Sequence, residues 1–359
     1  MRESAEFRLA VECCRDSFDG WTGEPATPSH NRFDWQSFLD LVSFHRVEGF
    51  VWNALSNRDF SIPRDIRAQL SVAASTIAAD NLKATVECAT LRDGFAEVGV
   101  PLLFLKGLTL ASLAYGRPAL KAAVDIDVLI DVVDLKAAAD LLREHGYRVT
   151  IPRSEQALRA WHRRSRESVW VREQPFSQID LHTRVADNPL LIPGISVRSS
   201  SQIVDVGSGQ RLPTLATEEL FAYLAVHGGT SSWFRLKWVS DFAGLIHSKK
   251  PAEIEKLYRR SQEQGAGRAA AQGLLLADRL FETLAKNPEL RAELQRDRTT
   301  RRLVEISFSL LARRPREPTE HMLGTLPLHL APFLLMPGWR YKASELVGQV
   351  GKMTSQFVA

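Results

Sequence analysis

The chain has 359 residues, of which 45% are apolar and 25% are charged, as in an average folded globular protein. This balance excludes a disordered or fibrous protein, and the length indicates two packed units or one elaborated unit. Lysine and arginine exceed aspartate and glutamate by 46 to 42, a mild basic excess. Much of the excess lies in two arginine clusters, which we interpret as solvated faces because no recognisable nucleic-acid module accompanies them. Nucleic acid is therefore not an expected partner.

Cysteine usage and apolar segments indicate the compartment. Cys13, Cys14 and Cys88 lack the spacing of a disulfide framework or a metal knuckle, so we expect a reducing cytoplasm. Charges interrupt the N-terminus where a signal peptide needs an apolar stretch. The late apolar segment 322–336 is short for a membrane span and contains two prolines, which favours buried core or a docking segment. We expect a cytoplasmic protein without a membrane partner.

Up to about residue 100 the apolar residues recur at helical spacing. The steps around Phe38 are of three and four residues, and Asn31 or Asp34 is the expected cap of that helix. A second helix is expected over about 71–98. The pattern predicts an all-α N-terminal region over 1–100.

Between 101 and 212 strands alternate with helices. The expected strands are PLLFL, VDIDVLID, YRVTI, SVWVR and SQIDLHTRV, and the expected helices are LTLASLAY and VVDLKAAADLLREHGY. In VDIDVLID, Val124 and the alternate apolar residues should share one face, opposite Asp125 and Asp127. This order predicts a small mixed sheet flanked by helices.

From 213 to 359 the pattern is helical again. A helix should open at Thr217 and continue through FAYLAVHGG, and WFRLKWVSDFAGLIHS forms another amphipathic run. The proline-rich tail beyond Arg313 gives no prediction. The chain as a whole is predicted to be α+β, with the sheet region between N-terminal and C-terminal all-α regions.

Asp125 and Asp127 form the pattern with the clearest chemistry. One residue apart on a strand, they project to the same face between apolar neighbours. Burying unpaired carboxylates costs several kcal/mol each, so a bound cation is expected, and Mg²⁺ prefers such oxygen ligands. The alternative is a strand end whose carboxylates meet solvent or a lysine.

Asp180 lies in another apolar strand, QIDLH, and a neighbouring strand position would bring it to the first two aspartates. Three carboxylates can bridge two metal ions about 3.5–4 Å apart, an arrangement that activates an attacking hydroxyl and neutralises a leaving pyrophosphate. No spacing fixes which strand Asp180 joins, so an unrelated position stays open.

The segment from Leu102 to Tyr147 resembles an uncharacterised nucleotidyltransferase family of the polymerase-beta-like superfamily, of a type found beside lasso-peptide biosynthesis genes. The resemblance rests on a Lys-Gly turn, a tyrosine-bearing helix, a basic residue four before an Asp-x-Asp strand, a helix ending in Gly-Tyr and a later Asp-Leu-His strand. These fall on Lys106 and Gly107, Tyr115, Lys121, Asp125 and Asp127, Gly146 and Tyr147, and Asp180 with His182. A later helical stretch also matches, at His227, Gly228, Trp233, Arg235, Lys237, Trp238 and Asp241.

The resemblance implies a nucleotidyltransferase core over 101–212 with defined roles for these residues. Asp125, Asp127 and Asp180 would be catalytic and bind Mg²⁺ or Mn²⁺. The nucleoside triphosphate, expected to be ATP, would meet Lys106, Gly107, Thr109, Lys121, His182, Arg235 and Lys237. The wider superfamily has Gly-Ser at the turn where this chain has Gly107 and Leu108, so Thr109 or free helix amides would replace the serine. The usual arginine before the aspartates is Lys121, which keeps the charge but loses the bidentate fork.

Structural roles remain open for several of these residues. His182 is also consistent with a satisfied structural histidine. Packing or capping is the alternative for His227, Arg235 and Lys237, and the two tryptophans nearby are expected in the core.

The expected activity is transfer of a nucleoside monophosphate, AMP, from the triphosphate to a hydroxyl or phosphate on a peptide, protein or small molecule. One alternative is a catalytically silent nucleotide-binding regulatory module, which the missing Gly-Ser favours and the intact aspartates oppose. Another is an antitoxin-like transferase that modifies a protein partner.

Overall fold

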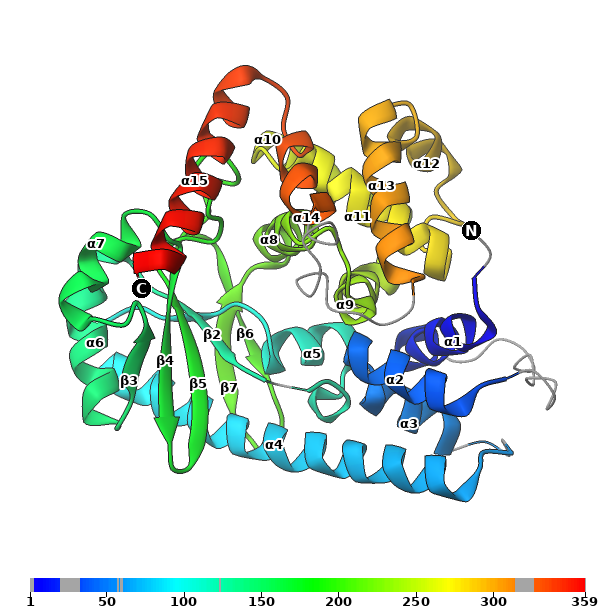
Figure 1. Ribbon diagram of the computed structural model, residues 1–359, viewed down its shortest axis with the longest axis horizontal. Coiled ribbons are helices and arrows are strands. Elements are labelled where there is room, and N and C mark those ends of the chain that lie inside the picture. Colours follow the sequence, from blue (N-terminus) through cyan, green and yellow to red (C-terminus); the bar gives the residue numbers. More distant parts are fainter. Residues whose placement is uncertain are drawn as a thin grey trace.

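The structure is a computed structural model that describes residues 3–19, 33–56, 58, 61–122, 124–313 and 326–358. A sheet at one side of the molecule lies beside a larger helical part, and helices occupy both ends of the chain (Figure 1). The predicted α+β class, with a small mixed sheet flanked by helices, is confirmed. None of the helices in these ranges combines the length and the apolar character that a bilayer-spanning segment requires.

The N-terminal region is helical, as predicted, and ends in one long helix. Its helices are α1 Ala5–Asp19, α2 Trp35–His45, α3 Glu48–Ser56 and α4 Arg64–Glu97. Asp34 caps α2, because its carboxylate accepts two backbone N–H groups of the first turn; Asn31, the other expected cap, lies outside the described residues. α4 begins earlier than predicted. Only Ile66 and Leu70 are buried in its first two turns, which leaves little apolar periodicity there.

A five-stranded mixed sheet forms the second part. Its strands lie in the order β1 Leu103–Phe104, β2 Ile126–Leu129, β5 Phe176–His182, β4 Glu167–Glu173 and β3 Arg148–Ile151. β2 and β5 are parallel, and the other neighbours are antiparallel. The connections contain helices α5 Leu108–Tyr115, α6 Leu135–Glu144 and α7 Leu158–His162. Each strand predicted in this region is present.

The aspartate-bearing strand begins later than its alternating pattern suggests. β2 starts at Ile126, which leaves Val124 half exposed and Asp125 just ahead of the strand. All of β2 is buried, because its two faces meet different cores. Val128 packs in the cluster that includes residues of α4 and α6, whereas Leu129 belongs to the large helical cluster. Asp127 alternates with Val128, so it faces the helical part of the molecule.

A second, two-stranded sheet was not predicted. It is the hairpin of β6 Ser201–Asp205 and β7 Arg211–Leu215. Pro213 within β7 weakens the strand signal, since proline lacks the N–H that a ladder needs.

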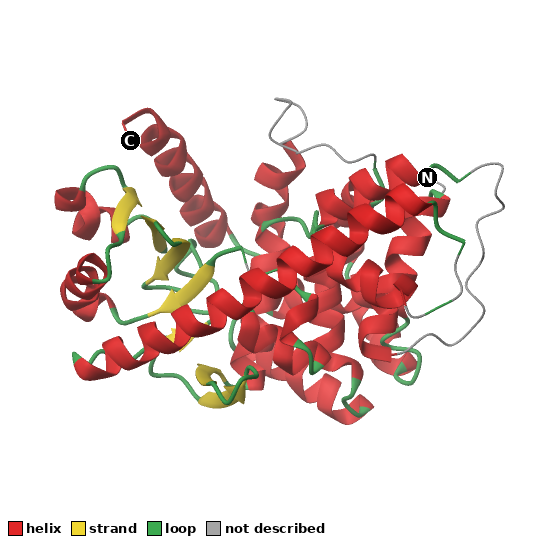
Figure 2. Cartoon of the chain, turned by 90° about the horizontal axis from the view of Figure 1, so that it is seen from below, coloured by secondary structure: helices red, strands yellow, loops and turns green. Residues whose placement is uncertain are grey.

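The C-terminal region is helical, and the predicted helices at Thr217 and in the tryptophan-rich run are confirmed. Its helices are α8 Thr217–Thr230, α9 Leu236–His247, α10 Pro251–Glu263, α11 Gly267–Phe281, α12 Pro288–Leu294, α13 Arg298–Leu311, α14 Leu326–Leu330 and α15 Trp339–Val358. The late apolar segment is described from residue 326 onward, where Ala331 and Leu335 are buried in the helical core, as expected of core. Figure 2 shows α4 as a rod that runs past both the helical part and the sheet.

Candidate functional site

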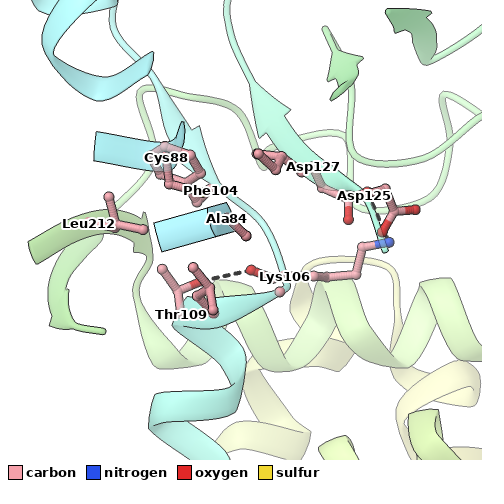
Figure 3. A pocket seen from close by; sticks show the side chains of 11 residues that line it. Ala84, Cys88, Phe104, Lys106, Thr109, Asp125, Asp127 and Leu212 are labelled. Carbon is pink, nitrogen blue, oxygen red and sulfur yellow. Dashed lines mark hydrogen bonds and ion pairs between the residues drawn. The ribbon is translucent and has the colours of Figure 1, made fainter. Parts of the chain in front are cut away.

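A tight turn between β1 and α5 brings Lys106 to the aspartates. Gly107 has φ +65° and ψ −126°, a conformation that residues with a Cβ rarely adopt. The hydroxyl of Thr109 donates to the carbonyl of Lys106 at 3.1 Å and fixes the turn (Figure 3). Lys106 Nζ then lies 3.0 Å from Asp127 Oδ1. The predicted Lys-Gly turn is present, and its lysine pairs with an aspartate.

Strand pairing gathers the three predicted carboxylates. In the parallel register of β2 and β5, Asp127 lies directly beside Asp180. Asp125 precedes β2 and is near enough for the charges of all three to interact. The open question of which strand Asp180 joins is thus answered: it is on the neighbour of the Asp-x-Asp strand.

Burial and mutual repulsion give these carboxyl groups different proton affinities. Burial, together with the charges of Asp127 and Asp125, raises the pKa of Asp180 to about 7. Burial and Asp127 also raise the pKa of Asp125. Burial alone would also raise the pKa of Asp127. The Lys106 ammonium and a hydrogen bond from His182 instead hold that pKa well below the usual range. Mutual repulsion therefore remains at Asp125 and Asp180, whereas Asp127 is paired with Lys106.

The donor set suits a hard divalent cation. Carboxylate oxygens are the ligands that Mg²⁺ and Mn²⁺ prefer. Within the described ranges, no three acidic, histidine or cysteine side chains already enclose a common metal position. Mg²⁺, however, needs only one or two carboxylates when phosphate and water supply its other ligands. A cation that arrives with a triphosphate would relieve the repulsion that raises the pKa of Asp180 and of Asp125.

The loop that leads into β2 is held from the long helix and from α3. The side-chain amide of Asn81, on α4, donates to the carbonyls of Pro118 and Lys121 at 2.9 and 2.7 Å. Gly49 of α3 lies so close that a Cβ there would come within 2.2 Å of the Leu120 carbonyl oxygen. The N-terminal helices thus fix the approach to the aspartates.

Lys121 links the same loop to α9. Its ammonium lies 2.7 Å from Asp241 Oδ2, and both side chains are only 4% exposed. The Tyr115 hydroxyl donates to Asp241 Oδ1 at 3.0 Å. The partner of Lys121 is therefore Asp241, so contact between Lys121 and the nucleotide stays a prediction.

Two further cations face the aspartates from the helical part. Lys237 is 9% exposed, and no hydrogen bond or ion pair to it is found among the described residues. Burial and the neighbouring Lys121 lower the pKa of Lys237 to about 8. Arg46, an exposed residue with φ +56° between α2 and α3, acts with Lys237 on the charge of Asp125. The site therefore draws on both helical regions.

Arg235 contacts protein groups of α2 and of its own segment. Its guanidinium donates to the Phe44 carbonyl and stacks on the rings of Phe44 and Phe234 at 4.6 and 5.2 Å. These contacts hold the α2–α3 junction against α9, and a nucleotide contact by Arg235 stays a prediction. Trp233 and Trp238 pack in or against the core, as expected.

Helix α8 turns a polar face toward the carboxylates. The hydroxyl of Tyr223 and both ring nitrogens of His227 are buried without a hydrogen-bond partner in the described part of the chain. Their rings are 6.0 Å apart, and the charges of Lys106, Arg166 and Asp127 act on both. Unpaired buried polar groups cost about 1–3 kcal/mol each, so this face suits a polar ligand.

Two cavities bear on where a ligand would bind. The one in Figure 3, between α4, β7 and the Lys-Gly turn, has about 10 Å³ and could hold one water. This cavity is too small for a nucleotide, whereas Asp125 and Asp180 are partly exposed. A groove of about 480 Å³ between α10 and α13 shares no residue with this site, and its Arg268 already pairs with Asp297 at 2.8 Å.

With this geometry in place, the comparison with known families is decisive. A family described as uncharacterised nucleotidyltransferase matches residues 31–282. The chain belongs to this family. The match spans α2 to α11, so it includes the sheet, the turn and the helices that face the aspartates. No curated protein gives a significant match to the chain.

The candidate site contains residues to which the sequence assigned no chemistry. Asn81, Arg46 and Glu167 come from segments without a chemical motif. Glu167 lies opposite His182 in the register of β4 and β5, and His182 in turn contacts Asp127 at 3.0 Å. Only strand pairing could have indicated Glu167, because its position in the sequence is unremarkable.

Proposed function

We propose that the protein is a metal-dependent nucleotidyltransferase that transfers AMP from ATP to a hydroxyl or phosphate group of an acceptor and releases pyrophosphate. The acceptor is a peptide, a protein or a small molecule, and the resemblance to families beside lasso-peptide genes favours a peptide. One observation carries the proposal: parallel pairing places Asp127 beside Asp180, with Asp125 and the Lys106 turn adjacent. Membership of a nucleotidyltransferase family supports it.

The triphosphate would bind where amides face the aspartates together with two cations that have no ion-pair partner among the described residues. Lys237 and Arg46 supply positive charge from the two helical regions. The first free amides of α5 follow Gly107, and the positive end of a helix favours phosphate. Thr109 would act through the turn rather than by direct contact, since its hydroxyl bonds the Lys106 carbonyl.

Asp125 and Asp127 would hold Mg²⁺ or Mn²⁺, and Asp180 would complete the ligand set. When bound, the ion would neutralise the triphosphate and polarise its α-phosphorus. The acceptor oxygen attacks that phosphorus, the bond to the bridging oxygen breaks, and pyrophosphate leaves. Asp180, on the strand beside Asp127, would receive the proton of the acceptor hydroxyl.

The test incubates the protein with each labelled nucleoside triphosphate and Mg²⁺ or Mn²⁺ and measures pyrophosphate release. Asp125→Asn and Asp127→Asn should each lower the rate at least 100-fold. Asp140→Asn is the matched control, because this carboxylate lies on α6 and pairs with Lys136 at 2.7 Å, away from the site. Equal rates in all variants would show that the aspartates do not carry the reaction, whereas nucleotide binding without turnover would favour a regulatory module.

A further inference from the structure

A row of polar contacts runs from the start of β4 to the buried Asp127. Arg166 Nε lies 2.9 Å from Glu167 Oε2, and the same oxygen lies 3.3 Å from His182 Nδ1. His182 Nε2 is 3.0 Å from Asp127 Oδ1. The side chains of His182 and Asp127 are 1% and 4% exposed. A carboxylate oxygen only accepts, so the His182 Nε2–H donates to Asp127, whereas Nδ1 lies at ion-pair distance from Glu167 without a hydrogen bond among the described residues.

These contacts determine which oxygen of Asp127 remains available to a ligand. His182 Nε2 and Lys106 Nζ approach the same atom, Oδ1, each at 3.0 Å. No hydrogen bond or ion pair to Oδ2 is found within the described ranges. Two donors on one oxygen restrict rotation of the carboxylate, so Oδ2 keeps one direction.

We propose that His182 and Glu167 are positioning residues that hold the Asp127 carboxylate with Oδ1 occupied and Oδ2 presented to the divalent cation. The inference rests on the proposed function. Neither residue touches the cation or the nucleotide; Glu167 orients the imidazole, and the imidazole orients Asp127. Groups that orient metal ligands in this way typically change metal affinity 10–100-fold when they are removed.

The register explains why these two residues are available. Glu167 is the first residue of β4 and His182 is the last residue of β5, and the two are cross-strand partners. His182 is also the partner of Leu129 in β2, two residues beyond Asp127. The imidazole therefore lies between the two carboxylates without any loop that must order.

The test measures Mn²⁺ binding to the full-length protein by electron paramagnetic resonance, with the non-reacting nucleotide α,β-methylene-ATP present. His182→Gln places an amide N–H near the position of Nε2, so it can still donate to Asp127. His182→Asn places its amide near Nδ1 and loses that contact. We expect Mn²⁺ to bind 10–100-fold more weakly to His182→Asn, less than 10-fold more weakly to His182→Gln, and 3–10-fold more weakly to Glu167→Gln, as order-of-magnitude values for such orienting groups. Nucleotide affinity without metal should change less than two-fold.

Equal Mn²⁺ affinities in His182→Asn and His182→Gln would overturn the proposal. If neither histidine variant folds, Glu167→Gln is the deciding variant, because the substitution is isosteric and the Glu167 side chain is 29% exposed. Wild-type Mn²⁺ affinity in Glu167→Gln would then overturn the proposal. Asp127→Asn separates the two hypotheses. If Asp127→Asn loses Mn²⁺ binding and the histidine variants keep it, only the positioning role is contradicted. Unchanged binding in Asp127→Asn contradicts the metal site itself.

Discussion

Replacement of Lys237 by methionine should stabilise the free protein and weaken its binding of nucleotide. Lys237 is 9% exposed, and its ammonium has no hydrogen-bond or ion-pair partner among the described residues. Methionine keeps the length of the side chain and removes the charge. A stabilising variant with reduced binding would mean that the charge is held there for a ligand.

The magnitude follows from the pKa of Lys237, which burial and Lys121 lower from 10.5 to about 8. A cation with a lower pKa in the folded protein costs stability below the folded pKa, and the cost disappears as the pH rises toward the unfolded pKa. At about 1.4 kcal/mol per pKa unit, the cost is about 3 kcal/mol at pH 7 and falls to about 1 kcal/mol near pH 9.5. Lys237→Met should therefore unfold at higher urea than wild type at pH 7, with a smaller gain at pH 9.5.

The assay is urea unfolding of both proteins at the two pH values, followed by the nucleotide-induced shift in Tm. Lys136→Met is the control, since this lysine on α6 is 89% exposed and its loss should change the free energy of unfolding by less than about 0.5 kcal/mol. A Lys237→Met variant that is less stable than wild type at pH 7 would refute the reasoning, because it would show that the ammonium has a stabilising partner.

Three other substitutions probe the site. Asp241→Asn leaves the buried Lys121 without its ion-pair partner and should destabilise the protein by about 3–5 kcal/mol in urea unfolding, part of which Lys121→Met in the same chain should restore; no rescue would contradict the pairing. Gly107→Ala forces a φ of +65° on a residue with a Cβ and should cost about 1–3 kcal/mol and lower nucleotide affinity, and an unchanged Tm would contradict the strain. Tyr223→Phe removes a buried hydroxyl that has no partner in the described residues, so the free protein should be at least as stable as wild type, with a gain of up to about 1–3 kcal/mol, while the ligand-induced Tm shift falls. A large loss of stability in the free variant would mean that the hydroxyl already has a partner.

Much of the site could be predicted because its chemistry is local in sequence. The Lys-Gly turn, the Asp-x-Asp strand and the strand of Asp180 each have a pattern of a few residues, and the structure has all three. Contacts between distant elements left no such pattern. Nothing near Lys121 in the sequence indicates that its ammonium forms an ion pair with Asp241. Only the packing of α9 on the loop brings the two residues together. Arg46 reaches the site because it adopts the αL conformation at the C-terminal end of α2, and no periodicity in the sequence indicates this conformation.

The length of α4 also sets the geometry of the site. Its 34 residues form a rod about 50 Å long that packs on α3 at one end and against the sheet region at the other. One residue inserted midway would turn one end by about 100° relative to the other and shift it by about 1.5 Å. Such a change in helical phase would carry Asn81 or Arg46 away from the aspartates without altering any residue of the site. Insertions and deletions in α4 should therefore be tolerated far less than in the loops around it.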